Sequence, residues 1–119
     1  MLKLKRTAEV TRSVKVRLPT ENPNAFNEGT ITYKAKIKSK DELAELGERG
    51  YTDQDYVDEL VTEVGGLGTE EGQPIAGEDA LKEVKTGVWS VYLIGAILQD
   101  YFEQYGDARV KNSRPSRGR

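Results

Sequence analysis

The sequence contains no cysteine and no histidine among its 119 residues. Without cysteine, neither a disulfide framework nor a thiolate metal site can form. Without histidine, the chain has no imidazole metal ligand, no Ser-His or Cys-His nucleophile pair, and no general base of the commonest kind. Carboxylates and lysines remain, but no motif arranges them as a recognisable site. We therefore expect a protein that is not an enzyme and needs no metal or cofactor.

Long apolar stretches are also scarce, and the chain has only one, at residues 88–105. The spacing of its apolar residues predicts a helix that is apolar nearly all round over its first three turns. The apolar run is interrupted at Ser90 and ends at Gln99 and Asp100, whereas a membrane span needs about 20 apolar residues. We therefore expect no membrane association. The helix must be covered either by the rest of the chain, as a core element, or in part by another protein.

Charge is distributed unevenly, although the formal net charge is only −2. Residues 1–40 carry 10 Lys/Arg and 3 Asp/Glu, residues 41–83 carry 2 and 14, and residues 84–119 carry 6 and 3. Blocks of opposite sign can be ordinary solvated faces, or they can pair within the chain or head to tail between copies. The possibility of head-to-tail pairing between copies leads us to expect a homo-oligomer.

Local patterns predict a single α+β domain at residues 10–105, preceded by a flexible lead-in at residues 1–9. Apolar and polar residues alternate before Pro19 and again after Gly29, which is the period of a half-buried strand. Proline and asparagine residues between them are typical of a loop. We therefore predict an N-terminal antiparallel β-hairpin at residues 10–38, with one aliphatic and one basic face.

The basic face of this hairpin raises the possibility of nucleic-acid binding, because clustered lysines can neutralise phosphates. It has only one arginine, however, and no interleaved aromatic side chain on which a base could stack. Lysine on exposed strands is also a common protection against edge-to-edge aggregation. We therefore expect no nucleic-acid partner. The residues of this face are Lys15, Arg17, Lys34, Lys36 and Lys38.

Residues 39–105 predict three to four helices arranged around the buried long helix. Ser39 and Thr52 each open a capping box, the pattern that satisfies the free N–H groups of a first helical turn. The apolar spacing of the second helix continues to Val64. A glycine-rich connector and a short helix at residues 78–85 follow. The connector resembles a phosphate-binding loop only in composition, because it lacks the Gly-Lys-Ser/Thr ending. Residues 106–119 predict a basic, disordered tail.

Several short motifs follow the hairpin in order: Val64-Gly65-Gly66-Leu67, Glu71-Gly72-Gln73-Pro74, a helix at residues 77–85, and Tyr101-Phe102-Glu103 followed by basic residues at 109–112. This layout, over residues 10–112, is similar to that of the tail assembly chaperones of long-tailed bacteriophages and prophages. Their turn usually carries tryptophan where this chain has Leu67.

The resemblance implies a non-enzymatic role in virion assembly. Members of this family bind the long, largely helical tape measure protein, keep it soluble, and promote polymerisation of the tail tube around it. They act in the host cytoplasm and are not expected in the mature virion. In many relatives a frameshift near the end of the gene gives a longer form that recruits the tail tube protein.

Aromatic residues of the long helix are the candidates for binding such a client. Aromatic side chains bring a large contact area at low entropic cost, and an amphipathic helix can be held in an apolar groove. The alternative is that several of them are plain core. A different class of function is also open, namely a structural protein of the tail or head-tail connector, of the tail completion or terminator type. The candidate residues are Trp89, Tyr92, Tyr101, Phe102 and Tyr105.

Overall fold

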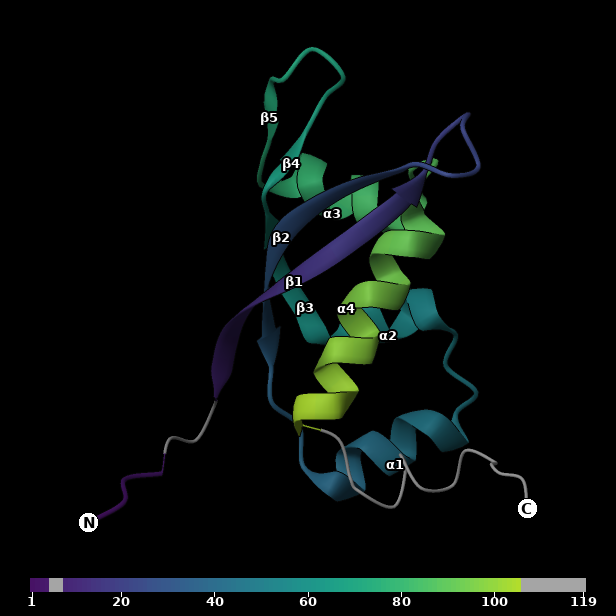
Figure 1. The fold of residues 1–119 in the computed structure, drawn as a ribbon. Coiled ribbons are helices and arrows are strands. Elements are labelled where there is room, and N and C mark those ends of the chain that lie inside the picture. The colour runs from purple at the N-terminus through teal and green to yellow at the C-terminus, as the bar shows by residue number, and fades with distance from the viewer. Residues whose placement is uncertain (5–7, 106–119) are drawn as a thin grey trace.

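The protein has an α+β fold in which an N-terminal antiparallel β-hairpin is followed by four helices (Figure 1), as the sequence predicts. The computed structural model describes residues 1–4 and 8–105; the predicted disordered tail at 106–119 lies outside this part. The strands are β1 (Glu9–Pro19), β2 (Phe26–Lys36), β3 (Val61–Gly65), β4 (Leu67–Gly68) and β5 (Pro74–Ile75). The helices are α1 (Lys40–Glu48), α2 (Asp53–Leu60), α3 (Glu78–Thr86) and α4 (Ser90–Tyr105).

Strands β1 and β2 pair along their whole length, from Glu9 opposite Lys36 to Pro19 opposite Phe26. Alternate residues therefore face opposite sides of the sheet. Ile31, Tyr33 and Ala35 of β2 point inward and are buried. The connecting loop is shorter than predicted, because β2 already begins at Phe26.

The outward side of the hairpin carries four of the five predicted basic residues, whereas Lys38 lies beyond the end of β2 and pairs with α2 instead. Acidic neighbours neutralise part of this charge. Arg17 pairs with Glu28 at 3.1 Å and Lys34 with Glu9 at 3.5 Å. Lys38, just beyond β2, pairs with Glu59 of α2 at 3.3 Å. Three of the basic residues of the N-terminal third thus have acidic partners within the fold. These pairs are largely solvated, so each contributes little to stability.

The prediction that the second helix continues to Val64 is wrong. Helix α2 ends at Leu60, and the chain continues as β3, which pairs antiparallel with β2 from Ala35–Val61 to Thr32–Gly65. Val61 and Val64 are spaced like helix residues, but as β-branched residues they also suit a strand. Burial beside β2 decides between the two, since both side chains are 6% exposed.

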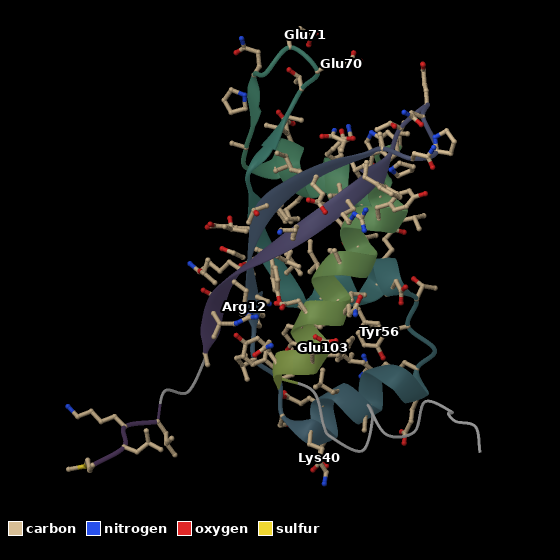
Figure 2. All side chains as sticks on the ribbon, in the orientation of Figure 1. Arg12, Lys40, Tyr56, Glu70, Glu71 and Glu103 are labelled. Carbon is tan, nitrogen blue, oxygen red and sulfur yellow. The ribbon has the colours of Figure 1, made fainter. Side chains whose placement is uncertain are left out.

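The glycine-rich connector also forms structure, because β4 and β5 make a short antiparallel hairpin. Figure 2 shows Glu70 and Glu71 at its tip. Gly66, at the entry to β4, has φ of +88°, a conformation that strongly favours glycine. A Cβ there would lie 3.0 Å from the Thr30 carbonyl oxygen. The hairpin therefore separates from β2 at a point where the backbones nearly touch.

The core lies between the inward face of the sheet and the helices. Helix α4 crosses β1 and also contacts α2 and α3, while α3 packs on β3 (Figure 1). Within the described residues, the helices thus cover only one face of the sheet. The largest fully buried side chains are Tyr33, Val57, Leu60, Val84, Ile97 and Tyr101.

Both predicted capping boxes form. Thr52 accepts a hydrogen bond from the Asp55 N–H at 3.2 Å, and the Asp55 carboxylate accepts one from the Thr52 N–H at 3.0 Å. Replacing Thr52 by alanine leaves the first-turn N–H of α2 unsatisfied. We expect the free energy of unfolding to fall by about 1 kcal/mol, measured by urea denaturation. A Ser13→Ala variant, at an exposed position of β1, serves as the control and is expected to change stability less.

Candidate functional site

The most distinctive surface of the protein is an apolar patch where α4 begins. Its large side chains are exposed, with Val88 at 86%, Val91 at 77%, Tyr92 at 44% and Trp89 at 38%. Gly95 continues the same side of the helix one turn later and is also exposed. Exposed apolar side chains that cluster rather than scatter indicate an interaction surface. We call these five residues the α4 patch.

The turn between α3 and α4 presents the α4 patch. Gly87 ends α3, and its N–H donates to the Glu83 carbonyl at 2.9 Å. A Cβ on Gly87 would overlap both the side chain and the carbonyl of Glu83, so only glycine fits here. The tight turn places Val88 and Trp89 before the first turn of α4, where Val88 is almost fully exposed and Trp89 is partly exposed.

Two opposite sides of α4 have different roles. Leu93, Ile94, Ile97, Leu98 and Tyr101 are buried against the sheet and the other helices. The outward side begins with the α4 patch and ends with Gln99 and Glu103, which are exposed and polar. The rest of the described chain therefore covers this helix on one side only.

The structure divides the five predicted aromatic residues into two groups. Trp89 and Tyr92 lie in the α4 patch, with their ring centroids 5.9 Å apart. Tyr101 is fully buried, and its hydroxyl donates to the Lys36 carbonyl at 2.7 Å. Phe102 and Tyr105 are half-buried, and both rings pack on Tyr101 with centroids 5.4 Å away. The first group is the more exposed of the two, whereas Tyr101 is part of the core.

A polar network that the sequence reading missed lies beneath the hairpin. Arg12 donates from Nε and Nη2 to the two carboxylate oxygens of Asp100, both at 2.9 Å, and Tyr33 donates its hydroxyl to Asp100 at 2.6 Å. Arg12 lies on β1 opposite the buried Tyr33, on the same inward side as Val10 and Val14, and Figure 2 marks its position. The sequence signal for this network is an arginine on the otherwise apolar inward side of the predicted strand. The network joins both strands of the hairpin to α4.

The network perturbs its ionisable groups in consistent directions. The hydrogen bond from Arg12 lowers the pKa of Asp100, and the bond from Tyr33 adds to this against the opposing effect of burial. Burial, followed by the hydrogen bond to Asp100, raises the pKa of Tyr33. Asp100 is therefore held as a carboxylate and Tyr33 as a neutral phenol. Both groups have structural partners, so the network serves to orient α4.

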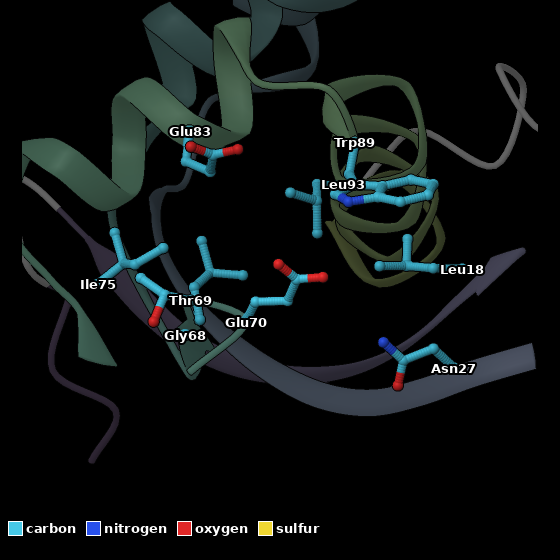
Figure 3. Close-up of a pocket in the computed structure, with 10 residues that line it drawn as sticks. Leu18, Asn27, Gly68, Thr69, Glu70, Ile75, Glu83, Trp89 and Leu93 are labelled. Atoms are coloured by element: carbon cyan, nitrogen blue, oxygen red, sulfur yellow. The ribbon is translucent and has the colours of Figure 1, made fainter. Parts of the chain in front are cut away.

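A groove of about 620 Å³ lies beside the α4 patch (Figure 3). Trp89, Leu93 and Leu18 form one side, and residues of the β4–β5 hairpin form the other. The carboxylates of Glu70 and Glu83 point into the space between them. A smaller hollow of about 180 Å³ continues it along β2 and shares Leu18, Asn27, Leu67, Gly68 and Leu93 with it. We call the two together the edge groove.

A substitution at Gly95 tests whether the α4 patch is open to solvent without disturbing the fold. A Cβ there would meet no atom within 4 Å, and the backbone is helical. We expect Gly95→Ala to raise the free energy of unfolding by about 0.5–1 kcal/mol, because alanine is the better helix former. Thermal denaturation measures this gain. A loss of stability would mean that the site is not open.

Within the described residues, no three or more Asp or Glu side chains gather as metal ligands. In the same part of the chain, no helix is both long enough and apolar enough to cross a membrane. Comparison with protein-family models, curated proteins and solved structures finds no match. The residues and their geometry must therefore support any functional assignment.

Proposed function

We propose that this protein is a non-enzymatic assembly chaperone of the phage tail type, which binds helical segments of the tape measure protein through the α4 patch. The observation that carries the proposal is the exposure of Val88, Val91 and Tyr92 at the start of a helix whose opposite side is buried. An amphipathic client helix can bury its apolar face against such a surface. The similarity in motif order supplies the identity of the client.

The polarity of the α4 patch suits reversible binding. It joins aliphatic side chains with a tryptophan and a tyrosine, both of which keep a polar group available to water. Along the helix it gives way to Gln99 and Glu103, so the apolar surface ends after about two turns. A surface of this size contacts only part of a client helix, so binding is weak enough for a tighter-binding protein to displace it. A chaperone that hands its client to tail tube subunits needs this behaviour.

The proposal places the protein in the host cytoplasm during assembly and outside the mature virion. Its further partner is the tail tube protein, reached through a longer frameshifted form. The competing function, a structural protein of the tail or head-tail connector, requires the chain to stay in the particle. Analysis of purified virions by mass spectrometry therefore separates the two.

Co-expression tests client binding. The chain is produced with the tape measure protein encoded beside it, and the soluble fraction is analysed by size-exclusion chromatography. We expect the two to co-elute and the tape measure protein to aggregate when this chain is omitted. Failure to associate, together with presence of this chain in purified virions, would replace the chaperone proposal by the structural one.

A further inference from the structure

The first residues of β2 form an open sheet edge. Strand β1 pairs with all of β2, but β3 pairs only with Thr32–Ala35. Gly66 still lies against Thr30 and Ile31, and then the chain turns away into β4. Within the described chain, residues 26–29 therefore have no strand partner on the β3 side. An open edge of this kind can pair with another extended segment.

The edge groove lies directly beside this open edge and has its own chemical preference. Its floor contains apolar side chains from β1, β2, β4 and α4: Val16, Leu18, Ile31, Leu67 and Leu93. Glu70 and Glu83 face into it, and neither has an ion-pair partner in the part of the chain that the structure describes. The groove therefore suits an extended segment with both apolar and basic side chains.

The chain itself contains a segment with this pattern, Met1-Leu2-Lys3-Leu4. Leu2 is 86% exposed and Leu4 is 84% exposed, so neither leucine packs on its own fold. In an extended conformation the two leucines share one side and Lys3 takes the other. The sequence adds Lys5 and Arg6, and has no acidic residue before Glu9. The segment thus complements the edge groove in both apolarity and charge.

This segment cannot place both of its leucines in the edge groove of its own chain. Ala8 is fixed at the far end of the hairpin, where its carbonyl accepts from the Ile37 N–H at 2.9 Å. Ile31, the residue of the groove nearest to this end, lies opposite Val14, six residues along β1 and so about 20 Å away. From Ala8 back to Leu4 a fully extended chain spans at most about 14 Å. Leu4 therefore cannot enter the groove of its own chain, and the two leucines can occupy a groove together only in a second copy.

We propose that residues 1–4 of one copy add to the open edge of β2 in a second copy, with Leu2 and Leu4 in its edge groove. Lys3 then points away from the groove, so its positive charge is attracted to the acidic groove of the second copy without a direct contact. The contact joins two different surfaces, so each copy keeps one segment and one groove free for further copies. Such a heterologous contact closes into a ring or grows into a helical array.

Two variants disable the two halves of this contact separately. Leu2→Asp/Leu4→Asp alters the segment at positions outside the folded domain. Gly29→Tyr fills the groove, because a Cβ on Gly29 meets no atom within 4 Å and its φ is not positive. Gly29→Ala, which leaves most of the groove open, is the matched control. Thermal denaturation verifies that each variant folds.

Light scattering coupled to size-exclusion chromatography then gives the mass of each sample over a range of concentrations. We expect the parent and Gly29→Ala to exceed the 13.3 kDa of one chain as concentration rises. Each disabled variant alone should stay monomeric. A mixture of the two should form a 1:1 dimer and nothing larger, because only one intact segment and one intact groove remain per pair.

Three results would overturn the proposal: a parent that is monomeric throughout, disabled variants that assemble like the parent, or a mixture that stays monomeric. If Gly29→Tyr is monomeric but Leu2→Asp/Leu4→Asp still assembles, a segment other than residues 1–4 fills the groove, and the proposal is also wrong. No client is present in these samples. The outcome is therefore independent of whether the protein binds a tape measure protein.

Discussion

Replacing Asp100 by alanine is expected to lower the free energy of unfolding by about 2–4 kcal/mol at neutral pH. The carboxylate has a side-chain exposure of 14% and accepts hydrogen bonds from both Arg12 and Tyr33. Its removal leaves the Tyr33 hydroxyl, on a residue only 1% exposed, without its partner. Urea denaturation of the parent and the variant measures the difference.

Measuring stability as a function of pH tests whether the charge of Asp100 causes this loss of stability. Folding lowers the pKa of this carboxyl, so the unfolded chain takes up its proton more readily. The network therefore stabilises the fold above the unfolded pKa of about 4, and this contribution is lost as pH falls through the lower folded value. We expect Asp100→Asn to be less stable than the parent at neutral pH, with the gap narrowing in acid. A gap that stays constant with pH would assign the loss to packing instead.

Replacing Val91 by aspartate is expected to reduce affinity for the tape measure protein by at least about tenfold, because it places a charge in the centre of the apolar contact. Val91 is 77% exposed in the free protein, so the substitution should change the free energy of unfolding little. Pull-down of the tape measure protein at graded concentrations measures the affinity.

Ala44→Asp is the control for this variant. Ala44 is exposed on α1, so the change adds the same charge to a helix outside the α4 patch. We expect it to leave client binding unchanged. Equal losses of binding in the two variants would mean that net charge, and not the α4 patch, governs the interaction.

Short-range patterns predicted most of the fold. The alternation of apolar residues located the hairpin, and Ser39 and Thr52 located two helix starts, because these signals are contained in a few neighbouring residues. The end of α2 depended on long-range pairing with β2, which helical spacing at Val61 and Val64 could not show. Propensity yields to tertiary context at such positions.

The candidate site was predicted only in part for a related reason. Apolarity identified the long helix, and Trp89 and Tyr92 were among its candidates, but periodicity could not show which side would stay uncovered. Asp100 was read only as the end of the apolar run, since its partner Arg12 lies 88 residues away. The edge groove combines residues from six elements and has no local signature at all.

The position of the sole tryptophan allows the most direct test of client binding at the α4 patch. Trp89 fluorescence can be followed while a tryptophan-free helical peptide from the tape measure protein is titrated in. We predict a saturable blue shift for the parent and for Gly95→Ala, and none for Gly95→Gln, whose longer side chain blocks the patch. Peptide binding that leaves Trp89 emission unchanged, or that Gly95→Gln does not weaken, would contradict the assignment of the α4 patch as the client site.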